Sequence, residues 1–258
     1  MYNPKLNKSG KPQEFKGVYF YPFLLKDEEY YEFIISMLSF NKNTTTDVNI
    51  VKMSYLKYLL ICVQYSFADI NIGEKLQEIL SFITKTNVII LYKRAEDDDE
   101  YFSKTSFSIK FDDIELDEWK FEKIREIILE QNGVSIKYLD EYDKTLEESL
   151  RFVYRNSNMA NHEEQIFAYC IYMKMSIQEV ENTVTFYQFG KIMDRIRLMV
   201  NFETMKPLEV SGQISFKDGK TIDDWLSHIP KRGRYDDILV KQESFVENND
   251  IFKVSGQK

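Results

Sequence analysis

Metal-binding residue types are scarce in this sequence, and the shortage excludes several classes of site. There are 2 cysteines and 2 histidines. Cys62 and Cys170 are too few for a disulfide framework or a cysteine-rich zinc site. His162 and His228 are far apart in the chain, whereas histidine-based metal sites need several ligands at short spacing. We therefore expect no metal site, and we interpret His162, in the first turn of a helix, as a solvated surface residue.

Glycine is also scarce, with 9 residues, and no glycine-rich phosphate-binding motif occurs. Ser211 and Gly212 lack the preceding glycine of a nucleophile elbow. Residues 218–221 (DGKT) match only the end of a P-loop, because the upstream glycines are missing. We expect no catalytic residue, no cofactor and no enzymatic activity.

Long apolar runs are absent as well. No run approaches the ~20 residues that cross a bilayer, and the first residues lack the apolar core of a secretory signal. Together with the low cysteine content, this predicts a cytoplasmic protein that does not associate with membranes.

Charge is distributed unevenly along the chain. The net charge is −8, but residues 96–148 contain 18 acidic and 7 basic residues, so the rest of the chain is mildly basic. An acidic balance disfavours broad binding to a phosphate backbone. Two explanations of the asymmetry stay open: packing of an acidic patch on a basic patch between copies, and a solvated acidic face.

The first half of the sequence predicts an α+β unit over residues 15–115, after a flexible arm over residues 1–14. Apolar spacing and helix-start signals predict helices that begin at Asp27 and that cover residues 50–66 and 73–85. Strands are predicted at 15–23, at 88–92 (VIILY), and at 101–111, where apolar and polar residues alternate.

The second half predicts a helical unit over residues 116–229, so the fold class is α+β and predominantly helical. A helix begins at Asp117 and ends at Gly133, with its packing face formed by Trp119, Ile124, Ile127 and Ile128. Another helix is expected over about 144–154. Capping-box spacing predicts three further helix starts, at Asn161 with Glu164, Ser176 with Glu179, and Thr185 with Gln188.

Residues 210–229 (VSGQISFKDGKTIDDWLSHI) combine serine, aspartate and histidine, but their spacing is that of structural elements. Asp218-Gly219 is a strong hairpin-turn signal, which predicts a β-hairpin over 213–222. A short helix is expected to begin at Asp223 or Asp224.

Residues 230–258 are mainly polar but carry spaced apolar side chains, which is typical of an extended tail or a partner-binding arm. A tail that packs on its own domain remains an equal alternative. Our candidate partner-binding residues are Trp225, Ile238, Leu239, Phe245, Ile251 and Phe252.

Residues 174–198 have the outline of a helix-turn-helix, a short helix followed by a tight turn and a longer helix. Lys191, Arg195 and Arg197 give the longer helix a basic side, although Asp194 interrupts it. The start of this helix is mostly aromatic, which suits packing better than base contacts. Because of the helix-turn-helix outline, we keep a DNA-binding regulator as the alternative function. In the main interpretation, nucleic acid is not expected as a partner.

Three stretches of the second half, FEKIREIILEQNG, MSIQEVENTVTFYQFGKIMDRI and PLEVSGQISFKDGKTIDDWLSHI, carry a family resemblance over residues 121–229. Their sequence motifs resemble those of morphogenesis-module proteins of tailed bacteriophages that infect Gram-positive hosts. The resemblance implies a non-enzymatic tail-assembly chaperone or virion structural protein that binds other phage proteins, and a homo-oligomer is compatible with it. It also implies a location in the host cytoplasm during assembly, with retention in the virion left open.

Overall fold

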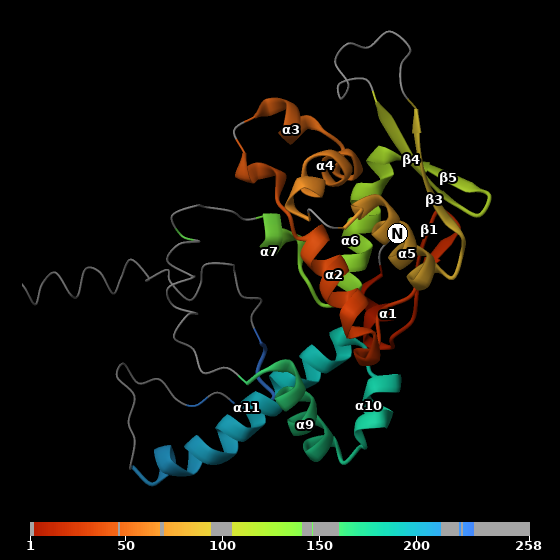
Figure 1. Cartoon of the computed structure of the whole chain (residues 1–258). Coiled ribbons are helices and arrows are strands. Elements are labelled where there is room, and N and C mark those ends of the chain that lie inside the picture. Colours follow the sequence, from red (N-terminus) through yellow and green to blue (C-terminus); the bar gives the residue numbers. More distant parts are fainter. Residues whose placement is uncertain are drawn as a thin grey trace, which may run out of the picture.

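The computed structural model describes residues 3–45, 47–67, 70–93, 105–140, 146, 160–212, 222 and 224–229. These residues form a predominantly helical α+β fold, as the sequence predicts. Figure 1 shows a main body that contains the strands and α1 to α7, and a helical group below it that contains α9, α10 and α11. No helix in these ranges is long and apolar enough to cross a membrane.

The N-terminal residues fold onto the body. They form α1 (Pro4–Lys8), β1 (Gln13–Phe15) and β2 (Val18–Phe20), and β1 and β2 pair as an antiparallel hairpin. The expected flexible arm is therefore wrong for residues 3–14. The physical reason is a set of buried amide contacts: Gln13 donates to Asn7 at 2.8 Å, and Asn7 donates to the Glu130 carbonyl at 3.0 Å. The strand expected over 15–23 is shorter, because Lys16 and Gly17 form a turn with positive φ.

A series of helices follows through residue 84, of which α2 and α5 match the helices expected from Asp27 and over 73–85. They are η1 (Leu25–Asp27), α2 (Glu28–Leu38), η2 (Lys42–Thr44), α3 (Val48–Lys52), α4 (Tyr55–Ile61), η3 (Val63–Ser66) and α5 (Ile72–Thr84). The helix expected over 50–66 is broken between α3 and α4. There, Met53 and Ser54 are extended, and the Ser54 side chain caps α4 by accepting from the Lys57 N–H at 3.2 Å.

A three-stranded antiparallel sheet comes next, in the order β3 (Val88–Lys93), β4 (Ser106–Phe111) and β5 (Ile114–Asp117). The expected strand at 88–92 corresponds to β3. The strand expected at 101–111 is present as β4 from Ser106, while residues 101–104 lie outside the described residues, and β5 is an additional strand. The buried side chains of the sheet are Val88, Ile109, Phe111 and Leu116, and α5 contacts β3. The sheet thus closes one side of the core.

The helix expected from Asp117 is present as η4 (Glu118–Lys120) and α6 (Phe121–Gln131). Asp117 caps it by accepting from the N–H groups of the next turn, and Gly133 ends it with a positive φ. Ile124, Ile127 and Ile128 are fully buried, whereas Trp119 is 59% exposed. The expected packing role of Trp119 is wrong, because it lies in the 3-10 turn before α6 and does not share the helix's packing face.

The last helices are α7 (Ile136–Asp140), α9 (His162–Met173), α10 (Ile177–Thr183) and α11 (Phe186–Val210). The three expected helix starts at 161, 176 and 185 are confirmed. The Asn161/Glu164 and Thr185/Gln188 pairs are reciprocal capping boxes, and Ser176 accepts from the Glu179 N–H at 3.3 Å.

Several predictions fall outside the described residues. These are the helix over about 144–154 apart from Leu146, the hairpin over 213–222 apart from Ile222, and the segment 230–258. The division into units near residue 115 stays a prediction, although α6 contacts α2 and α4 of the first unit.

Short contacts between distant segments join the helical group to the body, and we call these contacts the joint. Leu24 and Thr185 form an isolated antiparallel bridge, and the Leu25 N–H donates to the Val184 carbonyl at 3.0 Å. The Phe186 ring stacks on Tyr31 with a centroid distance of 3.6 Å. Because Thr185 caps α11, the joint fixes the point at which this helix begins.

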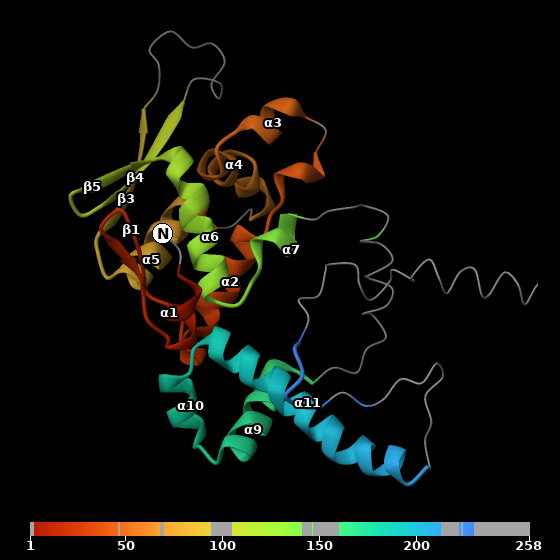
Figure 2. The same cartoon turned by 180° about the vertical axis from the view of Figure 1, so that it is seen from behind.

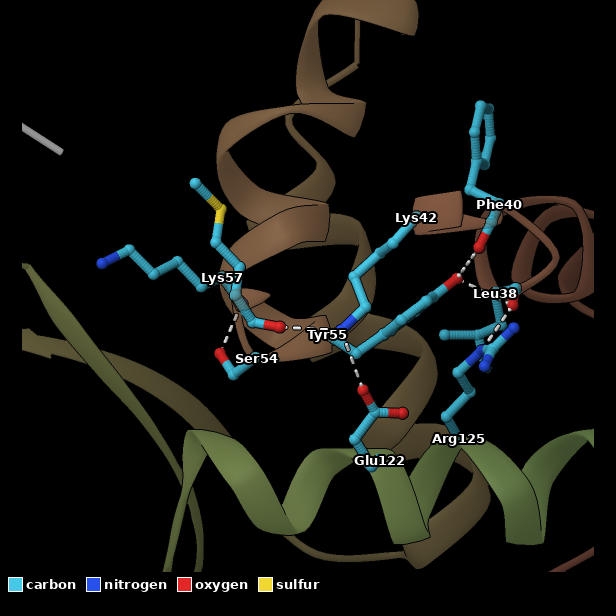
Figure 3. A network of polar contacts seen from close by, with 9 residues as sticks. Leu38, Phe40, Lys42, Ser54, Tyr55, Lys57, Glu122 and Arg125 are labelled. Atoms are coloured by element: carbon cyan, nitrogen blue, oxygen red, sulfur yellow. Dashed lines mark hydrogen bonds and ion pairs between the residues drawn. The ribbon is translucent and has the colours of Figure 1, made fainter. Parts of the chain in front are cut away.

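Within the body, the Tyr55 hydroxyl binds two helix-end carbonyls (Figure 3). Its oxygen lies 2.8 Å from the carbonyl oxygens of both Leu38 and Phe40. Arg125 donates from Nε to the Leu38 carbonyl at 2.9 Å, and its guanidinium carbon lies 4.2 Å from the Tyr55 ring centroid. Burial raises the pKa of Tyr55, so the hydroxyl stays protonated and remains a donor. The network connects α2, α4 and α6.

Replacing Tyr55 by phenylalanine removes the hydroxyl donor from the carbonyls of Leu38 and Phe40, although Arg125 still donates to the Leu38 carbonyl. We expect the free energy of unfolding to fall by about 1–3 kcal/mol, the usual cost of losing the partner of a buried polar group. Urea denaturation followed by circular dichroism measures this. Tyr58→Phe is the matched control, because the Tyr58 hydroxyl makes no hydrogen bond with any part of the chain that the structure describes; equal losses in the two variants would contradict the role of the network.

Candidate functional site

The distal half of α11, residues 198–210, extends away from the body (Figures 1 and 2). The buried residues of α11 are Phe186, Phe189 and Met193, all in its first two and a half turns, and none lies beyond Met193. The distal half nevertheless carries half-buried apolar side chains, namely Leu198, Met199, Phe202, Met205 and Leu208. Two further apolar residues, Val200 and Val210, are 42% and 79% exposed.

Residues 222 and 224–229, which we call the return segment, lie beside α11. Both Glu209 carboxylate oxygens accept from the Ile222 N–H at 3.3 Å, and Arg195 donates to the carbonyls of Trp225 and Ser227 at 3.0 and 2.7 Å. The short helix expected from Asp223 or Asp224 is wrong for residues 224–229, which form a turn. Asp224 closes this turn by accepting from the Leu226 N–H at 2.7 Å with its own side chain, a local bond that competes with helix formation.

Of the predicted partner-binding residues, Trp225 alone lies within the described ranges. It is 36% exposed, and its neighbour Leu226 is 68% exposed. The structure therefore places Trp225 on the flank of α11, where an apolar surface is accessible. The other five, Ile238, Leu239, Phe245, Ile251 and Phe252, lie outside the described residues.

A groove of about 570 Å³, which we call the basic groove, lies between the end of α1, the end of α10, α9 and one face of α11. Tyr169, Val184 and Ile192 contribute apolar surface to it. Lys8, Lys191 and Arg195 contribute positive charge, and no aspartate or glutamate is among its described lining residues. His228 and Ile229 of the return segment also line it, so the described chain stops at its edge.

A second hollow, of about 400 Å³, lies on another face of α11 and is lined by His162. Contrary to the expectation of a solvated residue, His162 is half-buried: its Nδ1 lies 2.6 Å from a Glu28 carboxylate oxygen, and its ring stacks on Phe186. Spacing along the sequence could not reveal this, because Glu28 and Phe186 come from distant segments. The contact links α9 to α2, which is a structural role.

Metal-ligating and thiol side chains of the described residues have the following arrangement. Within the described residues, no group of three or more histidine, cysteine or acidic side chains could hold a metal ion. Burial raises the pKa of both thiols, Cys62 and Cys170, which disfavours the reactive thiolate.

The segment 174–198, which resembles a helix-turn-helix, corresponds to α10 and the first half of α11. Its turn and the start of the longer helix are occupied by the joint: Thr185, Phe186 and Phe189 are 2%, 8% and 5% exposed. A recognition helix needs its first turns free for base edges. Arg195 donates a hydrogen bond to the return segment, and Arg197 donates one to the Gln165 side chain.

Comparisons with known proteins identify no relative. No family model matches the chain, and neither the curated proteins nor the solved structures contain a match.

The contact between Arg195 and the return segment is testable by tryptophan fluorescence. In a Trp119→Phe background, which leaves Trp225 as the one tryptophan, we expect Arg195→Met to shift emission to longer wavelength and to increase acrylamide quenching. The reason is that the carbonyls of Trp225 and Ser227 lose their shared donor. Arg197→Met is the matched control, because Arg197 contacts α9 instead. Unchanged Trp225 emission in Arg195→Met would contradict the assignment.

Proposed function

We propose that this protein is a non-enzymatic component of tailed-phage assembly that binds other phage proteins, as a chaperone or as a structural component. The observation that carries the proposal is the distal half of α11, which exposes apolar side chains and lacks buried ones. A helix of 25 residues is about 37 Å long, at 1.5 Å per residue. Isolated helices are marginal in water, and helices in proteins are stabilised mainly by packing of an apolar face. A bound partner would provide that packing.

The composition of the distal half suits a protein contact. Methionine and phenylalanine are enriched at such contacts, and methionine adapts to irregular surfaces. Met199, Phe202 and Met205 lie within two turns of one another and are all half-buried. The return segment adds Trp225 and Leu226 on the flank. The resemblance of residues 121–229 to phage morphogenesis proteins suggests which partners to test first: tail and capsid proteins, and a second copy of this chain.

The alternative, a DNA-binding regulator, has less support. Its recognition helix would begin with Thr185 and Phe186, which are already buried against the body. The net charge of −8 also disfavours binding to a phosphate backbone. Binding to duplex DNA that weakens steeply with rising salt and requires Arg195 or Arg197 would favour this alternative instead.

Hydrogen exchange measured by mass spectrometry tests whether the distal half of α11 lacks packing. In the free protein, we expect amides of residues 198–210 to exchange at least about 100-fold faster than those of residues 186–193, because local opening is easiest where few apolar contacts exist. On partner binding the difference should shrink. Equal protection along the whole of α11 in the free monomer would contradict the proposal.

Substitution on the exposed face tests the contact itself. We expect the full chain to give a defined mass above the 30.8 kDa monomer in native mass spectrometry, alone or mixed with a tail or capsid protein. Val200→Asp should weaken this complex by about ten-fold or more, since it places a charge in an apolar contact. Its control is Asn201→Asp, which adds the same charge at the adjacent exposed position and should have little effect.

Two outcomes would count against the proposal. A chain that stays monomeric and binds no tail or capsid protein would contradict the assembly role. A gene located away from tail and capsid genes would contradict the phage assignment while leaving a protein-binding role open.

A further inference from the structure

We infer that the basic groove is a docking site for residues 236–240 (DDILV) of this same chain. The inference is independent of the proposed function, because it requires no other protein. It rests on the chemistry of the groove, on the point where the described chain meets it, and on the sequence that follows.

The groove combines apolar surface with unbalanced positive charge. Of its apolar lining residues, Tyr169 and Val184 are buried and Ile192 is half-buried. Lys191 makes no hydrogen bond or ion pair within the part of the chain that the structure describes, whereas Arg195 is held in place by two backbone carbonyls. With no carboxylate among the lining residues, the groove matches an occupant that has aliphatic side chains beside acidic ones.

The chain itself supplies such an occupant close by. Asp236 and Asp237 are followed directly by Ile238, Leu239 and Val240. A groove of about 570 Å³ has the size of an ordinary ligand site and accommodates a few side chains. Two of these aliphatic residues, Ile238 and Leu239, are among the candidate partner-binding residues of the sequence.

Tether length favours docking within one molecule. Ile229 lines the groove, and Ile238 is nine residues further along the chain. Nine residues span at most about 30 Å when fully extended, so Ile238 always lies within that distance of Ile229. A tether of this length corresponds to an effective concentration in the millimolar range, roughly, which makes even a weak contact well occupied.

A competition experiment tests the docking. The probe is a fluorescein-labelled peptide of residues 235–243 (YDDILVKQE), and its binding to the full-length protein is followed by fluorescence anisotropy. We expect the variant Ile238→Ser/Leu239→Ser to bind the probe at least about ten-fold more tightly than the unmodified protein, whose own segment competes for the groove. The matched control is Ile251→Ser/Phe252→Ser, which should bind the probe as the unmodified protein does.

A charge exchange assigns the site. In the Ile238→Ser/Leu239→Ser variant, the additional substitution Lys191→Glu should weaken probe binding, and a probe with Asp236→Lys and Asp237→Lys should recover it. The control is Lys52→Glu, which reverses an exposed lysine on α3, remote from the groove (Figure 1), and should leave binding unchanged.

The following results would overturn the inference: equal affinity of the unmodified protein and the Ile238→Ser/Leu239→Ser variant for the probe, no binding to either, or binding that Lys191→Glu does not alter. Docking into a second copy would instead appear as a dimer that the Ile238→Ser/Leu239→Ser substitution converts to a monomer. That outcome would also overturn docking within one molecule. Because none of these measurements involves the distal half of α11, their failure leaves the proposed function unaffected.

Discussion

The joint between residues 23–25 and residues 184–186 determines how the second half of the molecule is arranged. It consists of a backbone bridge, a few main-chain hydrogen bonds and the stack of Tyr31 on Phe186. Because Thr185 is both a member of the bridge and the cap of α11, the joint sets the origin and direction of this helix. The basic groove and the hollow lined by His162 lie on different faces of the first turns of α11. The shape of both therefore depends on the joint, which positions this helix.

Local structure followed closely from the sequence because its determinants are local. Helix starts depend on a cap and on the residue three positions later, which is why Asn161 and Thr185 were sufficient to predict α9 and α11. The alternation along β4 reflects one buried face, with Ile109 and Phe111 inward. These signals act over a few residues and require no knowledge of the rest of the chain.

The errors came from contacts between distant segments. Residues 3–14 are mostly polar, yet Asn7 is buried because the Glu130 carbonyl supplies its partner from the other half of the molecule, and Asn7 in turn accepts from the buried Gln13. His162 is half-buried rather than solvated for the same reason, since its partner Glu28 is 134 positions away. The basic groove could not be predicted either: its lining comes from α1, α9, α10, α11 and the return segment, and no spacing rule brings these together.

The direction of α11 has a mechanical consequence. Once a bound partner packs the distal half, a helix of 25 residues held at one end acts as a lever, and a rotation of about 10° at the joint displaces its far end by about 6 Å, given a length of about 37 Å. Small changes in the packing of Phe186 against Tyr31 are therefore converted into large movements of Val210. Anything bound near that tip would transmit force back to the body through the joint and through the hydrogen bond that Gln188 donates to the Lys8 carbonyl.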